Sequence, residues 1–261
     1  MKSIGRWLLW VVLAGLALQL FFVLRVALMV VVDPQSTAFM RSEAWRVAGQ
    51  SLRSDKDWRW SAQWVDYDEI SPHLKRAVMA SEDAGFAEHD GVDWSAIEAA
   101  WVKNERRQEL VEKRTAQLER KLAKKPEAAE AAIKAIKPPK VIGGSTITQQ
   151  LAKNLLLSGE RNLLRKGQEL MLALTLDALL SKQRILEIYL NSVEWGEGVF
   201  GAEAAAQRYF KKPAAKLSAY EAARLAVMLP SPKFFETRQG SAYLSRRAST
   251  IVARMGDVTP P

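Results

Sequence analysis

The sequence predicts a mainly α-helical protein in which one N-terminal transmembrane helix precedes a single exported domain. Three observations support this fold class: residues 7–24 carry no charge, the segments after Pro139 repeat apolar residues near the helical period, and strand-like stretches are short. Hydrophobic residues make up 48% of the chain and charged residues 26%, which indicates a folded core and excludes a wholly disordered chain.

The N-terminal apolar run is long enough to cross a bilayer. It reads WLLWVVLAGLALQLFFVL over residues 7–24, is interrupted by Arg25, and continues to Val32. Because about 20 apolar residues span the hydrocarbon core, we expect a transmembrane helix over residues 7–32. Arg25 is close enough to its outer end for the guanidinium to reach the interface.

Basic residues before this run set the expected orientation. Lys2 and Arg6 precede it, so the positive-inside rule leaves residues 1–6 in the cytoplasm and places residues 33–261 on the other side of the membrane. A cleaved signal peptide is the alternative, but the run exceeds the usual apolar region of about 7–15 residues and no A-x-A site follows.

Composition excludes several kinds of chemistry. The chain has no cysteine, which excludes disulfides, thiolate metal sites and a cysteine nucleophile, and its only histidines, His73 and His89, exclude a multi-histidine metal centre. No Walker A loop or Rossmann glycine pattern is present, so no nucleotide cofactor is expected. The net charge of +9 favours anionic lipid or lipid-phosphate ligands over nucleic acid in an exported domain.

Local signals place several helices. Ser71 is expected to cap a helix that begins with Pro72 and delivers Glu82 and Asp83 near its end, and Asp93 can cap the following segment WSAIEAAWV. Core packing is the expected use of the apolar segment LMLALT, which is too short to cross a membrane. It is also the expected use of four tryptophans, with anchoring at the membrane interface as the alternative: Trp45, Trp58, Trp60 and Trp64.

A charged segment separates the two halves of the domain. Residues 103–140 contain twelve Lys and Arg against six Asp and Glu, are rich in alanine, and end in Pro138-Pro139. We expect one or two exposed helices followed by a stiff linker, and call residues 103–140 the charged arm. Its simplest interpretation is a solvated insertion without chemistry; binding to anionic lipid or an acidic partner is the alternative.

Three groups of polar residues could carry chemistry. In the first, two carboxylates near a helix end precede an aromatic ring, an imidazole and a glycine: Glu82, Asp83, Phe86, His89 and Gly91. A carboxylate in a partly apolar cleft can accept a proton near neutral pH. Adjacent Glu-Asp pairs more often simply face water, so this group by itself is modest evidence.

The second group begins at a helix N-terminus. Gly143-Gly144 leads into a hydroxyl-rich start, and Thr146 and Gln149 have the capping-box spacing. Such an N-terminus can bind an anion. The polar face comprises Ser145, Gln150, Lys153 and Asn154. Helix capping is the simpler explanation, but it does not account for the whole face.

The third group has one-turn spacing. Arg161, Arg165 and Glu169 would line one stripe if one helix covers them, with Lys166 beside them. A surface Arg165–Glu169 pair is the alternative. Several cations near separate carboxylates could hold a pyrophosphate while one carboxylate acts as base.

These groups, in this order, resemble the motifs of glycosyltransferase family 51, the peptidoglycan glycosyltransferases. EDAGFAEHDG is similar to the first motif, GGSTITQQLAKN to the second and RNLLRKGQE to the third; SKQRILEIYLNSVEWGEGVFGAEAAAQRYF and LSAYEAARLAVMLPSP also resemble family segments. No S-x-x-K occurs and 31 residues follow Pro230, so the chain resembles the monofunctional biosynthetic form without a transpeptidase domain.

The resemblance implies a lysozyme-like helical domain with a small membrane-proximal jaw in the bacterial inner membrane, its catalytic domain periplasmic. It implies that lipid II is polymerised into β-1,4-linked glycan with inversion and release of undecaprenyl pyrophosphate. By position, Glu82 would be the general base and Glu169 the second catalytic carboxylate. The other implied roles are substrate or pyrophosphate binding by Lys153, Arg161, Arg165, Lys166, Ser145, Gln150 and Asn154, and support of the base by Asp83 and His89.

The resemblance also suggests a Mg²⁺ or Mn²⁺ ion near Glu169, although no metal-ligand cluster is evident in the sequence. Implied partners are lipid II, the nascent glycan strand, membrane lipids and cell-wall synthesis or division proteins. The charged arm departs from the family, whose corresponding segment is shorter. A lysozyme-like hydrolase and a non-enzymatic anchored scaffold remain as alternatives.

Overall fold

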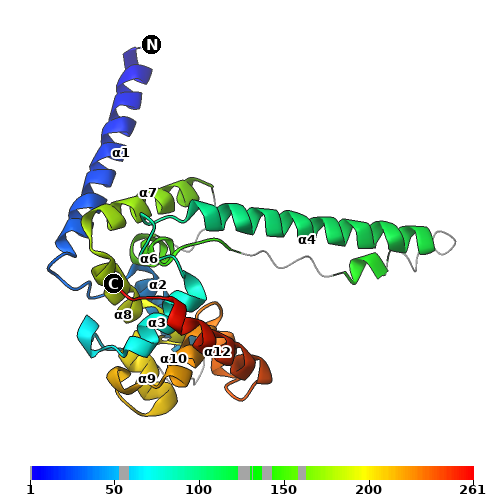
Figure 1. Cartoon of the computed structure of the whole chain (residues 1–261). Coiled ribbons are helices and arrows are strands. Elements are labelled where there is room, and N and C mark those ends of the chain that lie inside the picture. Colours follow the sequence, from blue (N-terminus) through cyan, green and yellow to red (C-terminus); the bar gives the residue numbers. More distant parts are fainter. Residues whose placement is uncertain (1, 53–58, 123–129, 131, 137–142, 158–162) are drawn as a thin grey trace. The chain divides into compact units, whose positions relative to one another are not determined.

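We describe the protein from a computed structural model, in which residues 2–52, 59–122, 130, 132–136, 143–157 and 163–261 are described (Figure 1). The predicted mainly helical class is confirmed. The helices are α1 (Lys2–Leu28), α2 (Ala38–Ser51), α3 (Pro72–Glu82), α4 (Trp94–Lys121), α6 (Ile147–Leu156), α7 (Leu163–Leu179), α8 (Lys182–Ser192), α9 (Ala202–Phe210), α10 (Ala219–Met228), α11 (Pro232–Glu236) and α12 (Ala242–Arg254).

Three short strands form one small sheet. They are β1 (Ser61–Ala62), β2 (Glu194–Gly196) and β3 (Val199–Phe200), in the order β1-β3-β2. β1 pairs parallel to β3, and β2 pairs antiparallel to it. Short 3₁₀ turns occupy Tyr67–Glu69, Ala214–Lys216 and Met255–Asp257.

The chain divides into two compact units. One comprises Met1–Val92 with Thr146–Pro261, and the other is Asp93–Ser145. In the second unit, α4 continues without a break from the segment after Asp93 into the charged arm. The expected boundary at residue 103 therefore falls inside a helix, because its Ala-, Glu- and Lys-rich sequence sustains helical propensity past that point. A role of the arm in binding stays a prediction.

Helix α1 satisfies the length and composition expected of a membrane span. Its apolar stretch is Ser3–Leu28, and no part of the most apolar section of this stretch is buried inside the protein. This suggests a single-pass membrane anchor. The helix ends at Leu28, and residues 29–32 turn instead of extending it to residue 32.

The predicted helix starts are confirmed. Ser71 accepts a hydrogen bond from the His73 N–H ahead of Pro72, and Asp93 accepts one from Ala96. At the start of α6, Thr146 and Gln149 form both bonds of a capping box. Short-range capping was predictable because each bond joins groups within one helical turn.

The core of the first unit is helical. α10 packs on α3 and α12, while α6 packs on α2, α7 and α8. α3 buries Leu74, Ala77 and Val78, which fixes the helix that ends at Glu82.

Two expectations about apolar side chains need correction. LMLALT is not buried all round: Leu172 and Ala173 are buried, whereas Met171 and Leu174 are exposed, because the described neighbours of α7, namely α6, α1 and α8, leave these two side chains uncovered. Trp45 is likewise exposed on α2.

Two of the other tryptophans pack against neighbouring side chains. Trp60 lies 4.8 Å from the Phe200 ring, and Trp64 packs beneath the Arg184 guanidinium. Both are half-buried, in agreement with a packing role. Trp58 lies outside the described residues.

Gly91 is required where the first motif turns back towards α6. Its φ is +76°, and an added Cβ would lie 2.9 Å from the Ala173 carbonyl oxygen. We expect Gly91→Ala to destabilise the protein by about 2 kcal/mol or more, because left-handed strain and a backbone clash add. Thermal unfolding of the detergent-solubilised chain measures this. Gly49→Ala is the control: Gly49 lies in α2 with open space around it, so alanine there should leave stability equal or higher by up to about 1 kcal/mol.

Candidate active site

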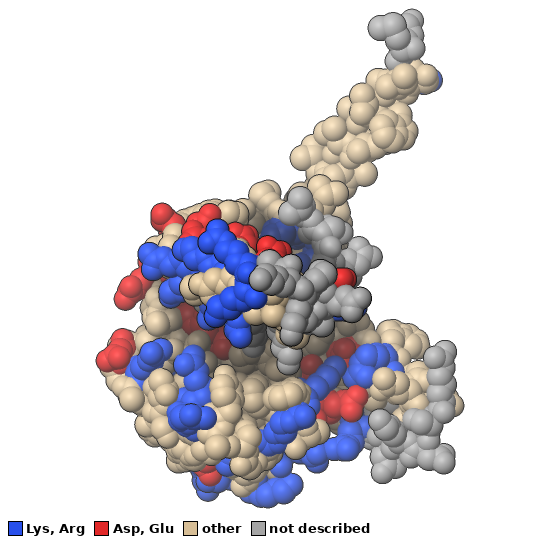
Figure 2. All heavy atoms as spheres, turned by 90° about the vertical axis from the view of Figure 1, so that its right-hand side faces the viewer, with Lys and Arg blue, Asp and Glu red and all other residues tan. Residues whose placement is uncertain are grey.

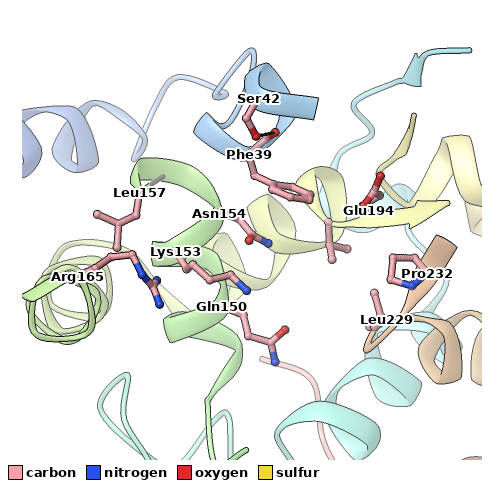
Figure 3. A pocket seen from close by; sticks show the side chains of 11 residues that line it. Phe39, Ser42, Gln150, Lys153, Asn154, Leu157, Arg165, Glu194, Leu229 and Pro232 are labelled. Carbon is pink, nitrogen blue, oxygen red and sulfur yellow. Dashed lines mark hydrogen bonds between the residues drawn. The ribbon is translucent and has the colours of Figure 1, made fainter. Parts of the chain in front are cut away.

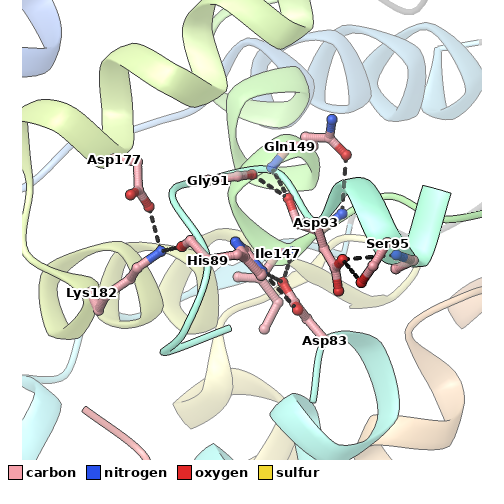
Figure 4. A network of polar contacts seen from close by, with 11 residues as sticks. Asp83, His89, Gly91, Asp93, Ser95, Ile147, Gln149, Asp177 and Lys182 are labelled. Atoms are coloured by element: carbon pink, nitrogen blue, oxygen red, sulfur yellow. Dashed lines mark hydrogen bonds and ion pairs between the residues drawn. The ribbon is translucent and has the colours of Figure 1, made fainter. Parts of the chain in front are cut away.

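Asp83 joins the end of α3 to the start of α6. Its carboxylate lies 3.0 Å from His89 Nε2 and accepts the Ile147 backbone N–H at 2.9 Å (Figure 4). Thr146 Oγ1 donates to the Gly91 carbonyl at 2.6 Å, a second bond between the same two segments. These hydrogen bonds hold the first and second motifs together. Because the Asp83 carboxylate already contacts His89 and the Ile147 N–H, it is not available as a general base.

The loop carrying His89 is also held from α8. Lys182 Nζ donates to the His89 carbonyl oxygen and to Asp177 at 2.6 Å (Figure 4). The same ammonium group lies over the Phe86 ring. Phe86 is fully buried, which agrees with packing as its role. This scaffold fixes the backbone directly after Glu82.

Glu82 is the half-buried carboxylate at the end of α3. Gln150 Nε2 donates to its Oε2 at 3.1 Å, and Ser81 Oγ donates to its Oε1 at 3.3 Å. Burial raises the pKa of Glu82, assisted by the negative charge of Asp83, although the two hydrogen bonds oppose the shift. A carboxylate with a raised pKa accepts a proton more readily at neutral pH, as a general base must.

Tyr189 orients the amide that contacts Glu82. Its hydroxyl donates to Gln150 Oε1 at 3.0 Å, so the Gln150 amide must present its NH₂ to Glu82. The Tyr189 side chain is fully buried on α8, and burial raises its pKa well above the usual value, which keeps the hydroxyl protonated as a donor. Sequence reasoning missed Tyr189, although it lies in a segment that resembles the family.

A cavity of about 340 Å³ opens beside this network. Lys153, Asn154 and Gln150 reach it from α6 and Arg165 reaches it from α7, while Glu194 and Pro232 lie across from them (Figure 3). Basic side chains are also prominent on the face of the molecule drawn in Figure 2. The cavity therefore offers two cations to an anionic group within reach of the Gln150–Glu82 pair.

Glu169 holds the Arg165 guanidinium. Arg165 Nη1 lies 3.0 Å from Glu169 Oε2, and Lys166 Nζ pairs with Oε1. The Glu169 side chain is only 5% exposed, so this is a buried ion pair and not the surface pair considered from the sequence. Glu169 is not among the residues that line the cavity, but it pairs with Arg165, which does line it.

The remaining predicted site residues that the structure describes are not among those that line the cavity. Arg161 lies outside the described residues. Ser145 is the last residue of the second unit and does not line the described cavity. Lys166 is half-exposed and also lies outside the cavity lining.

The donor set near Glu169 does not fit a resident divalent ion. Mg²⁺ and Mn²⁺ favour several oxygen ligands, but this carboxylate is already shared between a guanidinium and an ammonium group. Over the described ranges, no group of three or more acidic, histidine or cysteine side chains could hold a metal. A divalent ion therefore stays a prediction from resemblance.

Glu194 is a cavity residue that the sequence did not reveal. It is 6% exposed at the start of β2, with Lys233 Nζ at 3.4 Å, and Lys233 also contacts Glu43 at 2.5 Å. Burial raises the pKa of Glu194 to about 7, with the negative charge of Glu43 adding to the shift against the attraction of Lys233. Its carboxyl group therefore changes charge near neutral pH inside the cavity.

Glu194 should make the folded protein less stable as the pH rises. Because its folded-state pKa of about 7 exceeds the ordinary 4.5, the folded chain binds the proton more tightly than the unfolded chain does. The resulting contribution to the free energy of unfolding is lost between about pH 5 and pH 8. In the wild type, the free energy of unfolding should fall by an amount on the order of 3 kcal/mol over this pH range, and we expect Glu194→Gln to abolish that fall. Unfolding at both pH values, with the exposed carboxylate variant Glu88→Gln as control, measures it; an unchanged pH slope would contradict the assignment.

The fold and the site define a class of protein. A half-buried carboxylate, held by an oriented amide beside a cavity lined by Lys153 and Arg165, belongs to an enzyme that can accept a proton while it holds an anionic group. The family model described as Transglycosylase matches residues 49–123 and 123–256. The chain therefore belongs to the transglycosylase family, and the resemblance drawn from its motifs is confirmed.

Full-length relatives agree with this assignment. The chain is 48% identical over 264 residues to a biosynthetic peptidoglycan transglycosylase of Burkholderia thailandensis, covering 100% of this chain and 90% of the relative. Proteins with the same description from Burkholderia pseudomallei and Burkholderia orbicola are each 47% identical, over 100% and 99% of this chain and 90% and 94% of the relatives.

Proposed function

We propose that this chain is a peptidoglycan glycan-chain polymerase. It would transfer the growing lipid-linked glycan to the 4-hydroxyl of lipid II, with inversion at the anomeric carbon, β-1,4 linkage and release of undecaprenyl pyrophosphate. The observation that carries the proposal is the half-buried Glu82, bonded to Gln150 at the edge of a cavity that Lys153 and Arg165 line. The relatives' shared description supports the substrate class.

Glu82 would remove the proton from the acceptor 4-hydroxyl as that oxygen attacks the donor. Its raised pKa favours this step, and Gln150, oriented by Tyr189, fixes the carboxylate geometry. Asp83 would support the base indirectly, by holding His89 and the start of α6.

Lys153 and Arg165 would stabilise the pyrophosphate as negative charge develops on it. Glu169 would position Arg165, and Asn154 and Gln150 would contact the substrate. Pyrophosphate is already a good leaving group, so charge stabilisation serves it more than protonation. Arg161, Lys166 and Ser145 stay proposed contacts from resemblance.

The proposed site of action is the outer side of the bacterial inner membrane. A single pass through α1, with Lys2 and Arg6 on the cytoplasmic side, would put the catalytic domain in the periplasm, where cell-wall synthesis or division proteins could recruit it.

The test uses the detergent-solubilised full chain with labelled lipid II, with and without Mg²⁺. A polymer ladder that lysozyme digests would support the transferase. Labelled preformed glycan is the second substrate: its shortening without a ladder would indicate a hydrolase instead. Neither product from a folded, lipid-reconstituted chain would favour the scaffold alternative.

A further inference from the structure

A second cavity lies where α1 leaves the predicted membrane span. It has a volume of about 210 Å³, and its lining includes Arg25 and Leu28 from α1, Asp33 and Ser36 from the connecting segment, and Arg41 from α2. It shares no lining residue with the cavity beside Glu82. It is therefore a separate feature of the first compact unit.

Two guanidinium groups share this cavity without a carboxylate of their own. Arg25 forms no ion pair with any described residue, and Arg41 donates from Nη1 to the Ser36 carbonyl at 3.2 Å and to Ser36 Oγ at 3.1 Å. Asp33 is the acidic side chain in the lining, and it pairs with Arg184 at 2.7 Å. Two like charges in one cavity repel each other unless an anion lies between them.

The place of the cavity indicates which anion can reach it. Arg25 lies three residues before the end of α1, near the outer end of the apolar run that continues to Val32, and the polar chain begins at Asp33. Long basic side chains at such a boundary extend to the lipid headgroups, where phosphates are concentrated. The N-terminus of α2, capped by Thr37, lies next to the lining residue Ser36 and adds a partial positive charge.

We propose that Arg25 and Arg41 together bind the phosphate of an anionic phospholipid headgroup in this cavity. Guanidinium groups donate two parallel hydrogen bonds to phosphate oxygens, and a phosphate between them neutralises both charges. The bound headgroup would link the end of α1 to α2. Because α2 also supplies Phe39 and Ser42 to the catalytic cavity, the lipid would fix that wall relative to the membrane surface.

The test is native mass spectrometry of the full chain released from neutral detergent, titrated separately with phosphatidylglycerol and phosphatidylcholine. We expect one tightly retained phosphatidylglycerol, bound about tenfold more tightly than phosphatidylcholine. Arg25→Gln and Arg41→Gln should each weaken it by about tenfold. Arg6→Gln, a matched charge loss at the other end of α1, should change it less than about twofold.

Two further measurements test the source of the anion and the folding of the variants. Inorganic phosphate tests the source of the anion: displacement of the lipid by equimolar phosphate would overturn the lipid assignment. Melting curves establish that the variants fold; should the glutamine variants not fold, Arg25→Lys and Arg41→Lys keep the charge and should weaken binding only in part. Wild-type affinity for phosphatidylglycerol in both folded variants, or no preference over phosphatidylcholine, would also overturn the proposal.

Discussion

Replacing Glu82 with glutamine should lower the rate of lipid II polymerisation by about 10³-fold, because general-base catalysis contributes about 10²–10⁴-fold and an amide cannot accept the proton. The substitution keeps size and shape at the Gln150 contact, so folding and lipid II affinity should change little. Initial rates at saturating and limiting lipid II separate the two effects.

The pH profile gives an independent check on Glu82. A base works only when ionised, and burial raises its pKa above the ordinary 4.5. The acid limb of kcat/KM should therefore lie above pH 4.5, with activity lost as the pH falls through the raised pKa. Glu88→Gln, an exposed carboxylate in the same motif, serves as control and should retain full activity. Near-normal turnover in Glu82→Gln would refute the base assignment.

Glu169→Gln should lower polymerisation by about 10²-fold through Arg165, because the neutral amide no longer holds the guanidinium in the cavity. The loss should appear in kcat, where the leaving pyrophosphate is stabilised, more than in KM. Lys166→Gln provides the comparison: that side chain is half-exposed and outside the cavity, so a loss of a few-fold is expected.

Two measurements distinguish positioning by Glu169 from metal binding. Arg165→Ala leaves the buried Glu169 carboxylate with Lys166 as a remaining partner and should destabilise the chain by about 2 kcal/mol, whereas Glu169→Gln should cost less. Titration of Mg²⁺ and Mn²⁺ against Glu169→Gln should restore no activity if its role is to hold Arg165. Recovery at high metal concentration would instead make Glu169 a metal ligand.

Parts of the site that depend on short-range rules were predictable. Ser71, Asp93 and the Thr146–Gln149 pair cap helices through bonds within one turn, which sequence spacing reveals directly. The Arg165–Glu169 pair has the same one-turn spacing. Its burial was not predictable, because it depends on which elements cover α7.

Long-range contacts account for what sequence reasoning missed. Tyr189 contacts Gln150 from a different helix, and Asp83 accepts a backbone N–H from Ile147, although residues 93–145 separate the two in the sequence. The raised pKa of Glu194 arises from burial beside Glu43, far away in the chain. No local pattern encodes such contacts.

By itself, the sequence determined the mainly helical class, the N-terminal apolar helix, the helix caps and the order of three motifs whose family the comparisons confirm. These features follow from periodicity and composition, which act over a few residues. The tertiary structure alone decided that Glu169 works beside Arg165 in a buried pair, that one face of α7 stays apolar and exposed, and that Gln150 presents its NH₂ to Glu82. The reason is physical: burial and hydrogen-bond direction depend on neighbours that only folding brings together.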